Sequence, residues 1–312
     1  MNKIAVLIPC YNEELTIAKV IKDFQQELPQ AVIYVYDNNS NDKTAKIAQE
    51  YGAIVKKEYR QGKGNVVRSM FVDIDADIYV MIDGDDTYPA NFVHDLIDPV
   101  KQGEADMVIG DRHSNGTYKE ENKRALHNFG NNLVKNLINI LFHAHLKDIM
   151  TGYRVFNKKF VKNMAVNSDG FEIETEMTLH ALDKKFLIKE IPIEYRDRPE
   201  GSFSKLNTYS DGMKVLKTIM WLFKDYKPLA FFAFVSLLFF ILGLLVGIPV
   251  LLEFLETSFV TKIPSAILSV GLMIISVLAL FSGFILDTAV KQHREAYYLQ
   301  MMRWLNGDRY ND

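Results

Sequence analysis

The sequence predicts an α/β domain with a parallel sheet, followed by a hairpin of two membrane helices. From residue 4 to residue 82, short apolar runs alternate with amphipathic segments, a pattern typical of a parallel sheet with helices on both faces. Two later stretches, 229–252 and 264–286, contain no charged residue, and each exceeds the roughly 20 residues that cross a bilayer.

The composition suits a folded protein rather than a nucleic-acid binder. The 312 residues are 48% hydrophobic and 24% charged, which allows one large domain or two smaller ones. A net charge of −3 argues against nucleic acid as a partner. The single cysteine, Cys10, cannot form an internal disulfide and fits a reducing compartment. The apolar run 4–8 is too short for a signal peptide and is expected to be the first strand.

The elements follow in order along the first third of the chain. We expect strands at 4–8, 32–36, 53–56 and 78–82. Helices should lie between them: one after the first strand, one at 43–51 and one that opens at 61–65. The first helix is expected to turn Leu15, Ala18, Ile21 and Leu28 inward. Each polar loop follows the carboxyl end of a strand, where open α/β sheets bind ligands.

Residues 83–86 carry the strongest chemical signal. Asp83 and Asp85 stand directly after the 78–82 strand and offer hard oxygen ligands to Mg²⁺ or Mn²⁺, which also bind phosphates. The alternative is an acidic turn punctuated by Gly84 and Pro89. Gly62-Lys63-Gly64 is not a P-loop, because the four-residue spacer and the following Ser or Thr are missing. No G-x-G-x-x-G sequence follows the first strand, so a dinucleotide-binding fold is unsupported. Asp37, at the end of the second strand, could instead accept hydrogen bonds from a uracil or ribose.

A series of short motifs resembles family 2 glycosyltransferases of the GT-A fold. The dolichol-phosphate mannose synthase branch, which includes bacterial polyprenyl-phosphate glycosyltransferases with two C-terminal membrane helices, is the most similar in pattern. The likeness runs from about residue 4 to residue 290. The motifs are Ile8–Glu14, Asp37–Thr44, Gly62–Gly64, Asp83–Asp85, Gly110–Arg112, Asp148–Arg154 and Arg198–Leu206.

This resemblance implies a role for particular residues. Asp83 and Asp85 would hold Mg²⁺ or Mn²⁺, while Asp148 and Arg198 would be catalytic. The nucleotide would be bound by Pro9, Tyr11, Glu13, Asp37, Lys63 and Asp83. The acceptor phosphate would be bound by Arg112, Arg124 and Asn128, and Ser204 and Lys205 would lie on a loop near the donor pyrophosphate.

Some positions depart from the family pattern. Asn38 stands where an Asp is usual, Thr87 where a Gln is common and Asn128 where a Ser is common. They leave the sugar and the details of metal coordination open.

The need for a catalytic base is a separate question. A phosphate acceptor with a second pKa near 6 arrives largely ionised, so Asp148 is expected to position a substrate rather than remove a proton. Glu172, Glu174 and Glu176 compete for a catalytic role. A strand end or a solvated first helical turn explains these three equally well.

The segment after Lys119, Lys123 and Arg124 reads as a helix with an apolar stripe. It is either an amphipathic core helix or an interfacial helix beside a lipid acceptor. The stripe consists of Leu126, Phe129, Leu133, Leu137, Ile140 and Leu141.

The membrane segment is expected to be multi-pass, with the catalytic domain and both termini in the cytoplasm. Lysines flank the two spans, whereas the connector holds Glu253, Glu256 and only Lys262. The expected layout is a catalytic domain at 1–210, a juxtamembrane amphipathic segment at 211–228, the hairpin at 229–290 and a tail at 291–312. The tail contains Gln300-Met301-Met302-Arg303-Trp304, which matches a string of polysaccharide synthases but reads better as an interfacial helix.

The expected function is therefore inverting hexose transfer from a nucleotide diphosphate sugar to undecaprenyl phosphate at the cytoplasmic membrane face. The donor would be UDP-glucose or UDP-N-acetylglucosamine, the product would serve cell-envelope glycan modification, and a homo-oligomer is expected. The alternatives are a short-chain polysaccharide synthase that uses a sugar hydroxyl, or a non-catalytic membrane scaffold.

Overall fold

A computed structural model describes residues 2–114, 125–170, 172–197, 220–221 and 223–308. The chain divides into two compact units, Met1–Gly212 and Met213–Asp312.

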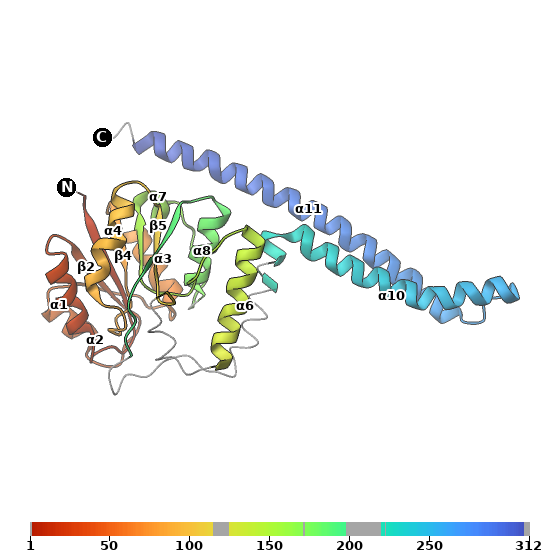
Figure 1. The fold of residues 1–312 in the computed structure, drawn as a ribbon, viewed down its shortest axis with the longest axis horizontal. Helices are drawn as coiled ribbons and strands as arrows, with labels where there is room; N and C mark the ends of the chain where they lie inside the picture. Colours follow the sequence, from red (N-terminus) through yellow and green to blue (C-terminus); the bar gives the residue numbers. More distant parts are fainter. Residues whose placement is uncertain (1, 115–124, 171, 198–219, 222, 309–312) are drawn as a thin grey trace. The chain divides into compact units, whose positions relative to one another are not determined.

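The first unit is built on a seven-stranded sheet with the order β3-β2-β1-β4-β6-β5-β7 (Figure 1). Its strands are β1 (Ile4–Cys10), β2 (Val32–Asp37), β3 (Ile54–Lys57), β4 (Ile78–Met81), β5 (Met107–Asp111), β6 (Arg154–Asn157) and β7 (Ile188–Pro192). Its helices are α1 (Ile17–Glu27), α2 (Thr44–Glu50), α3 (Lys63–Asp73), the short 3₁₀ helix η1 (Ala90–Phe92), α4 (Val93–Lys101), α6 (Ala125–Phe142), α7 (Lys158–Lys162) and α8 (Ile173–Asp183).

The predicted parallel arrangement is confirmed for β1 to β4, and β5 and β7 are also parallel to each other. Strand β6 differs, because it runs antiparallel to both β4 and β5. Its register places Arg154 opposite Met81. The start of β6, rather than its end, therefore lies at the edge where the parallel strands finish.

Apolar strand residues form the core between the sheet and its helices. Ile8, Val80 and Val155, on three adjacent strands, are fully buried. Helix α1 covers them with Ile17, Val20, Ile21 and Phe24. The prediction that Leu15 faces inward is wrong: its side chain is 63% exposed. The helix begins at Ile17, so Leu15 lies in the preceding turn and outside the helical periodicity.

Helix α6 is present as predicted, but its apolar residues divide between two faces. Val134 and Ile138 are buried, whereas Leu133 is 40% and Ile140 is 70% exposed. A core helix would bury the predicted stripe. The exposed part of that stripe is therefore an unpaired apolar surface of the described chain.

The second unit contains α10 (Pro228–Thr257) and α11 (Ile263–Asp308), two helices long and apolar enough to cross a membrane. Small polar groups connect them. The hydroxyls of Ser236 and Ser276 lie 3.1 Å apart, and the Ser269 hydroxyl donates to the Gly243 carbonyl at 2.9 Å. Polar contacts of this kind, together with close approach at small residues, are typical of helix packing in lipid.

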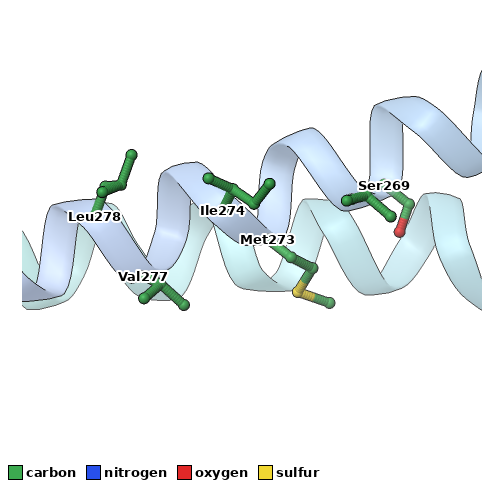
Figure 2. A pocket seen from close by; sticks show the side chains of 6 residues that line it. Ser269, Met273, Ile274, Val277 and Leu278 are labelled. Carbon is green, nitrogen blue, oxygen red and sulfur yellow. The ribbon is translucent and has the colours of Figure 1, made fainter.

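Helix α11 also carries a shallow apolar groove of about 340 Å³ (Figure 2). It is lined by Ser269, Val270, Met273, Ile274, Val277 and Leu278. The helix continues to Asp308, so the expected interfacial helix in the tail is a direct extension of the apolar segment.

Candidate active site

The chemically active side chains gather at one edge of the sheet. Strands β1, β2 and β4 end there, and the antiparallel β6 begins there. The segments that follow β1, β2 and β4 therefore meet the segment that precedes β6. A ligand site at the carboxyl ends of parallel strands is the usual arrangement in open α/β sheets.

Lys63 connects two carboxylates in this edge. Its ammonium lies 2.5 Å from Asp83 Oδ1 and 2.5 Å from Glu174 Oε1. The side chains of Lys63 and Glu174 are 9% and 7% exposed. Burial acts to lower the pKa of Lys63, but the two carboxylates outweigh it and the pKa is raised. Burial raises the pKa of Glu174, against the effect of Lys63. The lysine is therefore a buried cation between two acids.

Asp85 is held by the residue two positions later. Its Oδ1 accepts the Thr87 hydroxyl at 2.6 Å and the Thr87 backbone N–H at 3.2 Å. Gly84, which lies between Asp83 and Asp85, has no room for a side chain, because a Cβ would stand 2.8 Å from the Cys10 sulfur. Thr87, which departs from the family pattern, therefore fixes the orientation of the second acidic residue.

The carboxylates of Asp83 and Asp85 offer the oxygen ligands that a Mg²⁺ or Mn²⁺ ion prefers. Such ions take hard oxygen ligands, and Mg²⁺ typically uses one or two carboxylates together with substrate phosphates. Within the described ranges no group of three or more His, Cys, Asp or Glu residues could hold a metal. Asp83 and Asp85 would therefore supply only a partial ligand set, with phosphate oxygens as the remaining ligands.

Asn38 organises the loops on the β2 side. Its side-chain nitrogen donates to the carbonyls of Glu58 and Arg60 at 3.0 and 2.8 Å, and its oxygen accepts the Gly62 N–H at 2.7 Å. Only an amide offers both donors and an acceptor. The neighbouring Asp37 is buried and its carboxylate accepts the Ser40 N–H at 3.3 Å. The structure thus explains why an Asn serves at position 38.

Arg112 and Asp148 form a buried, two-pronged ion pair. Arg112 Nε lies 2.6 Å from Asp148 Oδ2, and Nη2 lies 2.9 Å from Oδ1. Burial acts to raise the pKa of Asp148, but the charge and hydrogen bonds of Arg112 lower it overall. Fork-to-fork pairs of this geometry are strong and directional. Asp148 is thus an ionised carboxylate with both oxygens engaged.

Tyr88 and Gly152 join this pair to the Asp83 side. The Tyr88 hydroxyl accepts from Arg112 Nη1 at 3.3 Å and from the Gly152 N–H at 3.2 Å. A Cβ on Gly152 would lie 2.2 Å from Asp83 Oδ2. Burial raises the pKa of Tyr88 to about 12, so its hydroxyl stays protonated. The backbone of the 148–154 segment therefore packs directly on the Asp83 carboxylate.

Arg154 holds the backbone of the 148–154 segment in place. It is fully buried, and its guanidinium donates to the carbonyls of Ile149 and Thr151 and to the Thr178 hydroxyl at 2.8–3.0 Å. Because these partners are neutral, burial lowers its pKa to about 10. The cation is held by backbone carbonyls that fix the curve of the segment between Asp148 and Gly152.

The three glutamates of the 172–176 region have distinct positions. The expectation of a solvated first helical turn is wrong for Glu174 and Glu176, which are 5% and 4% exposed in α8. Glu176 accepts the N–H groups of Asn167 and Ser168 at 2.8 and 2.9 Å. It caps a loop, whereas Glu174 contacts the site through Lys63.

The structure brings together Asp83, Asp85, Lys63, Arg112 and Asp148 of the predicted site. Pro9 lies within β1, and Tyr11 and Glu13 follow it. Arg124, Arg198, Ser204, Lys205 and the side chain of Asn128 lie outside the described residues. Sequence reasoning missed Tyr88 and Gly152, although Gly152 stands inside the Asp148–Arg154 motif and Tyr88 follows the Asp83–Asp85 motif by three residues. It weighed Glu174 without finding its partner, which lies 111 residues away.

Comparisons with known proteins identify a family of similar enzymes. A model of glycosyl transferase family 2 matches residues 5–164. Glycosyltransferase AglJ of Haloferax volcanii is 32% identical over 94% of this chain and 96% of its own. A dolichyl-phosphate hexose transferase of the same organism is 29% identical over 70% of this chain and 93% of its own.

A solved structure supports the fold. Glucosyl-3-phosphoglycerate synthase from Mycobacterium tuberculosis, crystallised with Mn²⁺, UDP and phosphoglyceric acid, is similar with a TM-score of 0.57 and 21% identity, over 72% of this chain and 78% of its own. The GT-A fold that the motifs implied is thereby confirmed.

Replacing Gly152 with Ala tests the contact with Asp83. The new Cβ would displace the Asp83 carboxylate, and we expect a loss of about 1–3 kcal/mol in the free energy of unfolding, as for other overpacked sites. Urea unfolding should be measured for Gly152→Ala, Asp83→Ala and the double variant. In the Asp83→Ala background the second change should cost much less, because the clashing group is gone. Additive losses would contradict the contact.

Replacing Asn38 with Asp tests the role of the amide. Two carbonyls lose their donor and face a carboxylate, so we expect a destabilisation of roughly 1–3 kcal/mol. Asn39→Asp is the control, since Asn39 is partly exposed and donates to Tyr59 alone among backbone groups. Surface changes of that kind usually stay within about 0.5 kcal/mol. Equal losses in thermal unfolding of the two variants would refute the assignment.

Proposed function

Because this chain belongs to glycosyl transferase family 2, we propose that it transfers a hexose from a UDP-sugar to undecaprenyl phosphate. The donor is UDP-glucose or UDP-N-acetylglucosamine, the transfer inverts the anomeric centre, and the lipid-linked sugar serves cell-envelope glycans. The observation that carries the proposal is the meeting of the Asp83–Lys63 side with the Arg112–Asp148 pair at one sheet edge. One side suits a nucleotide diphosphate and the other suits a second anion.

The donor half consists of the segments after β1, β2 and β4. Pro9, Tyr11, Glu13 and Asp37 surround the nucleotide, and Asp83 and Asp85 hold Mg²⁺ or Mn²⁺. When bound, the ion supplies positive charge that neutralises the departing diphosphate. Arg198, Ser204 and Lys205 are proposed to contribute on the pyrophosphate side. The similar synthase was crystallised with Mn²⁺ and UDP, which supports this choice of nucleotide and ion.

The acceptor half centres on Arg112, and Arg124 and Asn128 are proposed to bind the same phosphate. A lipid phosphate with a second pKa near 6 is mostly dianionic at neutral pH, so it needs orientation more than deprotonation. Asp148 has a lowered pKa and both oxygens bound to Arg112, which makes it a poor base. Its catalytic role is to aim the guanidinium. Relatives with names such as dolichyl-phosphate hexose transferase support a polyprenyl phosphate as the acceptor.

The membrane supplies the acceptor. Helices α10 and α11 are proposed to span it, with the catalytic domain and both termini in the cytoplasm. Lys224, Lys227 and Lys291 flank the apolar segments, and Glu253 and Glu256 lie in the stretch between them. The exposed apolar face of α6, with Leu133 and Ile140, suits the lipid interface. A pair of membrane helices is too few to enclose a sugar channel, which disfavours a polysaccharide synthase.

The defining experiment uses membrane vesicles from cells that produce the protein. Radiolabelled UDP-sugars are added with undecaprenyl phosphate, and the lipid is then extracted. Inside-out vesicles should label the lipid directly, whereas right-side-out vesicles should do so only after permeabilisation. EDTA should abolish labelling and Mn²⁺ or Mg²⁺ should restore it. Failure of every donor would favour the scaffold, and equal labelling of both vesicle types would reverse the orientation.

The pH dependence of Asp148→Asn separates orientation from base catalysis. We expect kcat to fall about ten- to hundredfold, because Arg112 loses a charged partner worth roughly 1.5–3 kcal/mol. Activity of the native enzyme should rise through the second ionisation of the acceptor phosphate near pH 6. The variant should keep that rise at the same pH. If the rise disappears instead, Asp148 is the titrating base.

A further inference from the structure

The donor half contains a conflict between two cations. Lys63 Nζ is bound at 2.5 Å to Asp83 Oδ1, while Asp83 is also one of the two carboxylates proposed to hold a divalent ion. An ammonium and a divalent cation on one carboxylate repel each other, and the repulsion is stronger at a partly buried site than in water. Both cannot keep full contact with the same oxygen.

The second carboxylate oxygen of Asp83 has little room to move. The Gly152 backbone packs on Oδ2 so closely that a Cβ there would overlap it at 2.2 Å. The Gly152 N–H is in turn bound to the Tyr88 hydroxyl at 3.2 Å. Backbone therefore restricts rotation of the carboxylate, and the lysine is the part of the arrangement that can move.

Glu174 is the second ion-pair partner of Lys63. Its Oε1 lies 2.5 Å from Lys63 Nζ, and its side chain is 7% exposed. Glu174 projects from the first turn of α8. If Lys63 releases Asp83, the buried ammonium still has one carboxyl partner. Without Glu174 it would face a buried position with no counter-charge, which is costly.

We propose that the Lys63 ammonium stays paired with Asp83 until the donor and its divalent ion bind. Lys63 then releases Asp83 and remains paired with Glu174. The inference rests on the proposed metal-dependent function. The divalent ion brings one more positive charge to Asp83 than the lysine takes away, and the negative charge of the donor diphosphate offsets that difference. Glu174 is a positioning residue: it acts on metal binding through Lys63 without being a ligand.

Two buried glutamates of α8 allow a matched test. Glu174→Gln removes the second partner of Lys63, which then holds Asp83 alone and competes with the metal. Glu176→Gln makes the same change of charge two residues further along α8. The carboxylate of Glu176 accepts hydrogen bonds from Asn167 and Ser168. Mn²⁺ binding to full-length protein in detergent is followed by the paramagnetic resonance of free Mn²⁺, with UDP present at a fixed concentration, without acceptor, and against a protein-free UDP blank.

We expect Glu174→Gln to raise the Kd for Mn²⁺ at least about tenfold, the scale of one lost charge-assisted contact, and Glu176→Gln to leave it within twofold. Equal shifts in the two variants, or no shift in either, overturn the exchange while the metal site stands. Absence of Mn²⁺ binding by the unmodified protein overturns the metal site and the exchange together.

A second measurement is independent of variants that fold poorly. A crystal structure of the unmodified protein with Mn²⁺ and UDP should show Lys63 Nζ beyond hydrogen-bonding distance of Asp83 and still on Glu174. Lys63 on Asp83 in that complex, or away from both carboxylates, overturns the proposal.

Discussion

Antiparallel pairing of β6 with β4 determines where the chemistry of this protein lies. Had β6 run parallel to β4, the residues before it would stand at the opposite edge of the sheet, about the length of a strand away. The register of Met81 with Arg154 instead places the 148–154 segment beside Asp83. The Arg112–Asp148 pair, Tyr88 and Gly152 depend on that one choice of direction. Two groups of polar residues that are distant in sequence thereby become one site.

Much of this arrangement could be predicted from the sequence. Alternating apolar runs located β1 to β4, and the acidic residues after β4 marked the edge that matters. The direction of β6 could not be predicted, because a short run such as Val155-Phe156 reads equally well in either direction. The exposure of Leu15 depended on a helix start two residues later, and helix boundaries are the least certain feature of a sequence pattern.

The buried charges were harder to anticipate. A glutamate in the first turn of a helix is usually solvated and favoured there by the helix dipole. Nothing local distinguishes Glu174 from Glu172, since its partner Lys63 comes from a distant helix. The three cations of the site also differ in kind. Lys63 pairs with two acids, Arg112 pairs with Asp148, and Arg154 is held by neutral carbonyls and a hydroxyl, so the local charge differs among the three clusters.

The contact between Gly152 and Asp83 has a consequence for how such proteins diversify. Two segments that pack atom against atom cannot be exchanged separately between relatives without a repair on the other side. Substitutions in the stretches 81–88 and 148–154 therefore have to be compatible with each other, despite some sixty residues of chain between the two stretches. A chimaera built to alter acceptor choice would keep both from the same parent and place its junctions in the surrounding loops.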